Sequence, residues 1–129
     1  MSMSAEVDPA AVVEAYLDAY DGKRIEAIAE LLAPNIRMRH HNRGFDLTGA
    51  ETLLAGLRQF EEIAPDRRYH SRRRLLVCGE QVVVEHRWEA TFLVDAPAFE
   101  VKAGETVALD VCSVFTVGDG LILEYDDYG

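Results

Sequence analysis

The fold is decided by VALDVCSVFTVGDGLILEYDDY, residues 107–128. Apolar residues recur at every second position on both sides of the Gly-Asp-Gly at 118–120, which is the pattern of two β-strands joined by a tight turn. We take 118–120 as a three-residue loop with Gly120 in the left-handed conformation, so that Val117 pairs with Leu121. The stretch therefore predicts an antiparallel hairpin.

The two faces of this hairpin differ in polarity, and the more apolar face is expected inside the protein. That face holds Leu109, Val111, Ser113, Phe115, Val117, Leu121, Leu123, Tyr125 and Asp127. Glu124 and Asp126 then point outward. A shift of one residue would exchange the faces and bring Asp110 inward in place of Asp127, so Asp110 is held in reserve.

Three helices are predicted before the strands. Asp8 can cap the first helix, which begins at Pro9, because its carboxylate accepts from free amides and proline has no amide to lose. The second helix covers 24–33. Thr48 followed by Glu51 reads as a capping box that opens the third.

One strand, 35–42, lies among the helices, and the chain after them reads as sheet. Residues 94–104 fit either a loop or an irregular edge strand. An antiparallel sheet with one apolar face must have that face covered, and here only the helices can cover it. The predicted class is α+β: a curved, mainly antiparallel sheet covered by three N-terminal helices.

Alternation also selects the inward side of the strand 81–92, since the other side is largely charged. The inward side chains are Val82, Val84, His86, Trp88, Ala90 and Phe92. A two-residue turn at Gly79-Glu80 sets Val77 opposite Val82 and puts Tyr69 and Arg73 on the same face. Arg73 is therefore expected beside His86.

Composition limits the functional classes. The chain has 129 residues, enough for one domain spanning 1–129, and a formal net charge of −10, which disfavours nucleic-acid binding. No apolar run is long enough to span a membrane and no signal peptide is evident, so we expect a cytoplasmic protein without membrane contact. The histidines at 40, 41, 70 and 86 lack the spacing of metal ligands, and no metal site is predicted.

The order of elements, together with LLVCGEQVVVEHRW and AGETVALDVCSVFTVGDGLILEYDDY, resembles the SnoaL-like polyketide cyclases of the nuclear transport factor 2-like superfamily. The likeness covers almost the whole chain. It implies a cystatin-like, cone-shaped half-barrel with an internal pocket, often paired into homodimers through the outer sheet face. Relatives include ketosteroid isomerases, limonene epoxide hydrolases and many proteins without known activity.

The resemblance also implies roles for individual residues. Asp127 follows Glu124 where the SnoaL-like cyclases have their acid/base aspartate, although a solvated tail is an equally open interpretation. His40 falls where ketosteroid isomerases have an aspartate base. Tyr16 stands on the helix from which those isomerases direct a tyrosine hydroxyl at an oxyanion, with an ordinary core position as the alternative.

The candidate residues form two groups. The catalytic candidates are Asp127, His86, His40 and Tyr16, with Asp110 and Arg73 in reserve. The expected pocket lining is Tyr20, Met38, Tyr69, Trp88, Phe92, Val111, Ser113 and Tyr125.

These residues predict a small-molecule-binding protein with a largely apolar ligand. The first hypothesis is a cofactor-independent isomerase or cyclase that moves a proton next to a carbonyl of a ring-containing compound. The second is a ligand-binding or dimerisation module without catalysis. The third is water activation of the epoxide hydrolase type, with Arg73 as the positioning arginine.

Overall fold

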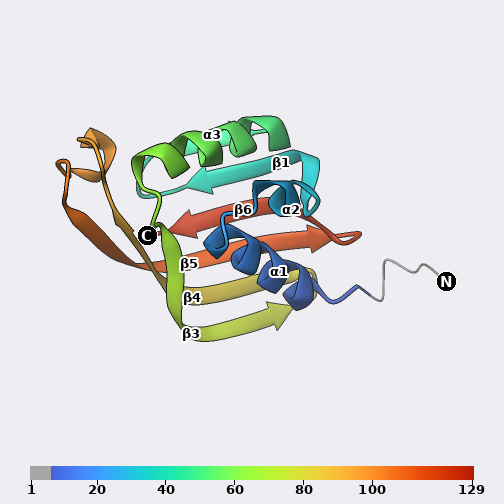
Figure 1. The fold of residues 1–129 in the computed structure, drawn as a ribbon. Coiled ribbons are helices and arrows are strands. Elements are labelled where there is room, and N and C mark those ends of the chain that lie inside the picture. The colour runs from blue at the N-terminus through green and yellow to red at the C-terminus, as the bar shows by residue number, and fades with distance from the viewer. Residues whose placement is uncertain (1–6) are drawn as a thin grey trace.

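The computed structural model describes residues 7–129 (Figure 1). In chain order its elements are α1 (Pro9–Asp21), α2 (Ile25–Ala29), β1 (Leu32–His40), β2 (Phe45–Thr48), α3 (Ala50–Ile63), β3 (Arg68–Cys78), β4 (Gln81–Thr91), the 3₁₀ turn η2 (Pro97–Phe99), β5 (Thr106–Gly118) and β6 (Leu121–Tyr128). The strands form one sheet of order β2-β1-β6-β5-β4-β3, in which β1 and β6 are parallel and the other neighbours antiparallel. The predicted α+β fold is confirmed.

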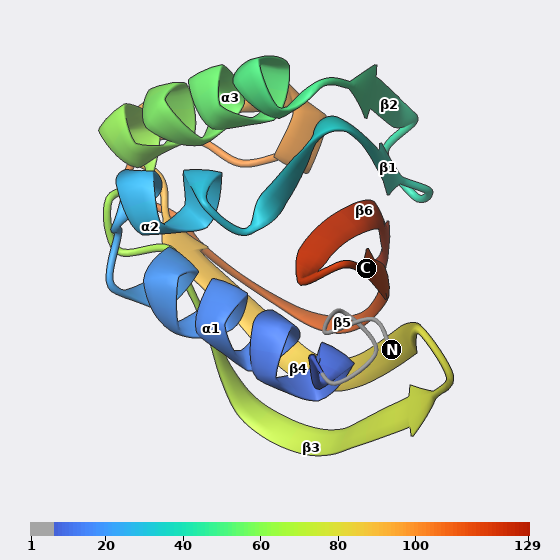
Figure 2. The ribbon, with the colours of Figure 1, turned by 90° about the vertical axis from the view of Figure 1, so that its right-hand side faces the viewer.

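The sheet curves around α1, and all three helices lie on its concave side (Figure 2). Helix α1 begins as predicted, because Oδ1 of Asp8 accepts a hydrogen bond of 3.0 Å from the amide of Ala10. Its buried stripe includes Tyr16 and Tyr20, which face the sheet. The core of the described residues therefore lies between the helices and the concave face of the sheet. A cavity occupies part of this space.

The second helix is shorter than the predicted 24–33, since α2 ends at Ala29. Leu32 instead begins β1 and pairs with Ile122 of β6, where both side chains are buried. Pro34 lies inside β1, in the part where the pairing with β6 is irregular, so its missing amide costs no ladder hydrogen bond. Burial against β6 therefore outweighs the local helical pattern.

The capping box predicted for α3 is wrong. Thr48 stays in β2, paired with Arg37, and the N-cap residue is Gly49 at φ +104°. The amide of Gly49 donates to the carbonyl of Ile36 at 2.8 Å, which ties the start of α3 to β1. Helix α3 is therefore positioned by strand pairing and not by a side-chain cap.

Strand β3 departs from simple alternation at a bulge between His70 and Arg74, where Ser71 has φ +52°. Val77 does pair with Val82, as predicted. Arg73 is exposed at this bulge, and the arginine near His86 is Arg72, so the prediction that Arg73 lies beside His86 is wrong.

The β5–β6 hairpin departs from the predicted register twice, by one residue in the same direction each time. The turn has two residues, with Gly118 paired to Leu121, and a bulge at Leu123 adds one residue to β6. Leu123 is therefore 39% exposed while Ile122 is fully buried, opposite to the expectation for the start of β6. A slip of one plus an insertion of one restores the same faces beyond the bulge, and Asp127 points inward as predicted.

The segment 94–104, whose state the sequence left open, folds back on itself. A single bridge joins Ala96 to Val101 around η2. This turn places the Phe99 ring against Trp88 and Phe60, both at 5.7 Å between ring centroids. The segment is thus held by an aromatic contact with the interior.

The helices of residues 7–129 are too short and too polar to cross a membrane.

Two glycines should respond oppositely to alanine. Gly120 has φ +77° in the hairpin turn, so Gly120→Ala should lower the free energy of unfolding by about 1–2 kcal/mol. Gly56 lies within α3, where an added Cβ meets no atom within 4 Å, so Gly56→Ala should raise it by about 0.5–1 kcal/mol. Urea unfolding of both variants checks the pair. Equal effects would contradict the assigned turn.

Candidate active site

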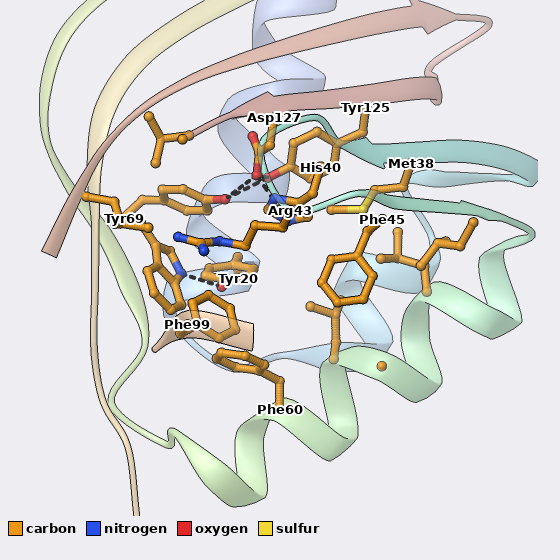
Figure 3. A pocket seen from close by; sticks show the side chains of 18 of the residues that line it. Tyr20, Met38, His40, Arg43, Phe45, Phe60, Tyr69, Phe99, Tyr125 and Asp127 are labelled. Atoms are coloured by element: carbon orange, nitrogen blue, oxygen red, sulfur yellow. Dashed lines mark hydrogen bonds and ion pairs between the residues drawn. The ribbon is translucent and has the colours of Figure 1, made fainter. Parts of the chain in front are cut away.

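A pocket of about 210 Å³ opens between the concave sheet face and helices α1 and α3. Its walls are mostly aromatic and aliphatic, and Figure 3 shows Tyr20, Phe60 and Phe99 at one end. Asp127 and Tyr125 of β6 lie at the polar end, together with His40 of β1. An apolar cleft with a few convergent polar groups is the usual form of a small-molecule site.

Asp127 is the centre of the polar end. Its side chain is buried, with the residue 1% exposed, and it faces the pocket. Burial raises the pKa of this carboxyl group, although His40 and the hydroxyls of Ser113 and Tyr125 act in the opposite direction. The solvated-tail interpretation of Asp127 is therefore wrong.

Two tyrosine hydroxyls contact one oxygen of this carboxyl group. Oη of Tyr125 lies 3.2 Å and Oη of Tyr69 3.3 Å from Oδ2 of Asp127, and the two hydroxyls are 2.7 Å apart. Burial raises the pKa of both tyrosines well above its usual value, so both stay protonated. Asp127 thus has neutral hydrogen-bond donors, and it makes no ion pair with an arginine or lysine of the part of the chain that the structure describes.

The other oxygen of Asp127 is held by a short chain of hydrogen bonds. Ser113 donates its hydroxyl proton to Oδ1 at 2.5 Å, and Nε2 of His86 lies 3.0 Å from the same hydroxyl oxygen. Since the serine proton points to the carboxylate, Nε2 of His86 carries a proton and donates it to Ser113. Burial, with Arg72 nearby, lowers the pKa of His86 to about 4, so the ring is neutral at pH 7.

His40 approaches Asp127 from the pocket side. Its Nε2 lies 3.6 Å from Oδ2 of Asp127, and the side chain is 32% exposed. Burial lowers the pKa of His40, a shift that Asp127 opposes. A neutral imidazole at this distance can exchange a proton with the carboxyl group or with a bound ligand.

Tyr20 of α1 lines the pocket beside Tyr69, with 4.9 Å between the ring centroids. Its hydroxyl accepts a hydrogen bond of 2.9 Å from Nε1 of Trp88, and its ring lies 4.4 Å below the guanidinium carbon of Arg67. Arg67 is fully buried, and its Nη1 donates to the Tyr20 carbonyl at 3.3 Å. Burial raises the pKa of Tyr20 to about 12, which Arg67 and Trp88 partly offset, so the phenol keeps its proton.

Most of the predicted pocket residues do line the cavity: Tyr16, Tyr20, Met38, His40, Tyr69, Trp88, Val111, Tyr125 and Asp127. Ser113 and His86 lie behind Asp127, and Phe92 lies behind Phe60 and Phe99. These three side chains support the wall without forming its surface.

The two reserve residues lie outside the pocket. Asp110 is on the outer face of the sheet, where Nη1 of Arg87 donates to its carboxylate at 2.9 Å. Arg73 is exposed beyond the β3 bulge. Neither residue lines the cavity, since the register of β5 puts Asp110 on the outer face and Arg73 is exposed at the irregular part of β3.

Sequence reasoning missed Arg43 and Phe99, which line the mouth of the pocket (Figure 3). Arg43 lies in the β1–β2 turn and Phe99 in η2, so neither belongs to an alternating pattern. Arg67 was missed as well, since a run of arginines gives no sign of which one is buried. Within residues 7–129 no cluster of three or more His, Cys, Asp or Glu side chains is arranged to hold a metal ion.

Comparison with models of known protein families shows to which family this chain belongs. The family model of the SnoaL-like domain matches residues 13–125. The chain belongs to the SnoaL-like family. Comparison of this SnoaL-like chain with curated proteins gives no match.

Solved structures share its fold at low sequence identity. A candidate polyketide cyclase from Pseudomonas putida KT2440 superposes with a TM-score of 0.84 at 18% identity, over 95% of this chain and 92% of that one. A LEH-like epoxide hydrolase from M. tuberculosis gives 0.75 at 20%, over 93% and 80%. A protein with a ketosteroid isomerase-like fold from Catenulispora acidiphila DSM 44928, in complex with trimethylamine, gives 0.75 at 18%, over 92% and 84%.

The buried histidine of this SnoaL-like domain should make folding sensitive to acid. His86 has a lower pKa in the folded state than the roughly 6.5 of an unfolded chain, so the unfolded state binds more protons as the pH falls through that range. The neutral His86 therefore contributes up to about 3 kcal/mol to the free energy of unfolding. This contribution is complete above pH 7 and is lost as the pH falls toward 4. The free energy of unfolding of His86→Gln, measured with urea, should therefore fall less between pH 7 and pH 4 than that of the wild type. Above pH 7 the free energies of unfolding of His86→Gln and of the wild type should change with pH in the same way.

Proposed function

We propose that this SnoaL-like protein is a cofactor-independent acid/base enzyme that acts on a small, ring-containing carbonyl compound. The observation that carries the proposal is the buried carboxyl group of Asp127, which faces an apolar pocket and has a raised pKa. A carboxyl group whose pKa moves toward neutrality can both accept and return a proton at physiological pH.

The reaction step is a proton transfer from carbon. The carboxylate of Asp127 takes a proton from the carbon next to the substrate carbonyl, and the C–H electron pair becomes the C=C bond of an enolate with its charge on oxygen. Return of the proton from Asp127 to a different carbon gives an isomer. Attack of the enolate carbon on a second carbonyl of the same molecule closes a ring, and the new alkoxide takes the proton. Both outcomes leave Asp127 ionised again.

Tyr20 is suited to stabilise the enolate oxygen. Its hydroxyl oxygen accepts from Trp88, which leaves its own proton free to be donated into the pocket that it lines. The buried guanidinium of Arg67 against the Tyr20 ring favours negative charge at this wall. Tyr16 also lines the pocket and is a second candidate donor.

The supporting residues keep Asp127 in place. His86 and Ser113 hold Oδ1 through consecutive hydrogen bonds, and they act as positioning residues because neither lines the cavity. His40 lines the cavity and is a candidate for moving the proton between Asp127 and the ligand or water. The site thus combines a proton acceptor, a proton carrier and an oxyanion donor.

The volume of the pocket limits the substrate. A cavity of about 150 Å³ holds one benzene ring, so about 210 Å³ with an open mouth holds one ring or two small fused rings. A four-ring skeleton does not fit. Apolar walls supply the affinity, and the polar end fixes the orientation of the carbonyl.

A non-catalytic ligand-binding role is the second candidate. Both oxygens of Asp127 already accept hydrogen bonds from protein hydroxyls, an arrangement that could serve only to hold a ligand's polar group. Water activation of the epoxide hydrolase type is less favoured. The sequence argument for it used Arg73, which is exposed, and Asp127 is the only carboxylic side chain among the described residues that line the pocket.

Hydrogen–deuterium exchange at carbon tests the proposed chemistry without knowledge of the natural substrate. The protein should accelerate exchange of the protons next to the carbonyl of 2-indanone in D₂O, followed by NMR. Asp127→Asn should lower the catalysed rate by about 10²–10⁴-fold, and Tyr20→Phe by about 10²-fold. Binding of 2-indanone without accelerated exchange would favour the non-catalytic role. Absence of both would contradict the proposal.

Two control measurements show whether a variant loses exchange activity because it lacks the proton acceptor, because it unfolds or because it no longer binds the ligand. Because the pKa of Asp127 is raised on folding, the folded state is penalised as the pH rises above the unfolded pKa of about 4, so Asp127→Asn should unfold no more easily than wild type at pH 8. Gly56→Leu extends a side chain from α3 into the pocket and leaves Asp127 intact. It should abolish both binding and exchange.

A further inference from the structure

Arg43 stands at the mouth of the pocket in the turn between β1 and β2. Its side chain is half-buried and reaches across the opening toward η2 (Figure 3). The guanidinium carbon lies 4.5 Å from the centre of the Phe99 ring, and Nη1 donates to the carbonyl of Ala98 at 3.3 Å. These contacts leave most of the guanidinium N–H groups available to a ligand.

Arg43 differs from its neighbours in having no carboxylate partner among the described residues. Arg37 pairs with Asp46, and Arg39 pairs with Asp126 and Glu124, all on the outer face. Arg43 makes no ion pair within residues 7–129. The one arginine of this hairpin that lines the pocket is therefore the one without a counter-ion.

None of the acids in and beside the facing segment, Asp95, Glu100 and Glu105, makes an ion pair with Arg43, and two of them bind that segment's own backbone. Oδ1 of Asp95 accepts from the amide of Ala103 at 2.9 Å, and Oε1 of Glu105 accepts from the amide of Lys102 at 2.6 Å. The natural partner of Arg43 is an anion that enters with the ligand.

We propose that the ligand of this pocket carries a carboxylate, which Arg43 binds at the mouth while the ring of the ligand occupies the aromatic cavity. A planar guanidinium offers two parallel N–H groups to a carboxylate, and the Phe99 ring holds it in one orientation. The proposal rests on the proposed function only in taking this pocket as the ligand site. The substrate class becomes a cyclic or aryl keto acid, oriented with its acid outward and its carbonyl toward Tyr20 and Asp127.

The rival role for Arg43 is mechanical. Through Ala98 and Phe99 it joins the β1–β2 turn to η2, and this strap could simply shape the entrance. If Arg43 only shapes the entrance, removing its guanidinium should change the affinity for charged and neutral ligands equally. An anion site would affect only the charged ones.

Matched acid and amide ligands distinguish the two roles. The probes are phenylacetate and 3-phenylpropionate with their primary amides, whose dissociation constants are measured at pH 7.5 by NMR titration. In the wild-type protein the acid of the better-fitting length should bind at least tenfold more tightly than its amide. Arg43→Gln should bring that ratio to about one and leave amide binding within twofold. Arg37→Gln, which removes a paired arginine of the same hairpin, should keep the wild-type ratio.

The remaining outcomes bear on the two proposals separately. Equal binding of acid and amide by wild type, a preference that survives in Arg43→Gln, or equal loss of both ligands in that variant would each overturn the anion site. Asp127→Asn should keep the preference for the acid. Loss of preference in Arg43→Gln together with an absence of 2-indanone exchange in wild type would sustain the carboxylate site and refute the proposed acid/base chemistry.

Discussion

The position of β6 between β1 and β5 is the constraint on which the candidate site depends. Asp127 pairs directly with Ser113 of β5 on one side and with His40 of β1 on the other. Both residues that flank Asp127 across the sheet therefore contact its carboxyl group, Ser113 at Oδ1 and His40 from the side of Oδ2. Tyr125, two positions earlier on the same face, contributes a hydroxyl in the same way. Pairing and alternation of neighbouring strands thus place Ser113, His40 and Tyr125, while Tyr69 reaches Asp127 across the concave face from β3.

The same strand separates two adjacent carboxyl groups into opposite electrostatic environments. Asp126 points outward, where partial burial would raise its pKa but hydrogen bonds from Arg39 and His41 hold the pKa below its usual value. Asp127 points inward to neutral groups, and burial raises its pKa. Neighbouring acids with pKa values moved in opposite directions typify sites where one carboxyl group transfers protons. Arg39 pairs with both outward acids of the strand, Glu124 and Asp126, whereas Asp127 makes no ion pair with an arginine of residues 7–129.

Alternation in the sequence was sufficient to predict the faces of β4, β5 and the end of β6, because burial on one face repeats every second residue. It could not show the bulges. The bulge at Leu123, together with the one-residue turn error, exchanged the faces of Ile122 and Leu123 but left Asp127 inward, whereas at the bulge after His70 Arg73 is exposed and Arg72 lies near His86. Arg43 and Phe99 lie in turns, where side-chain direction follows from tertiary contacts and leaves no period to detect.

The hydroxyl triangle at Oδ2 indicates how a transferred proton can be held. Tyr69, Tyr125 and Oδ2 of Asp127 make three mutual contacts of 2.7, 3.2 and 3.3 Å, but the two phenols supply only two protons. With Asp127 ionised, one contact has no proton, so the triangle is incomplete. A proton taken from a ligand onto Oδ2 completes it without movement of a heavy atom. The network therefore accommodates both protonation states of Asp127 in one geometry, and in the proposed reaction this would avoid reorganisation of the site during proton transfer.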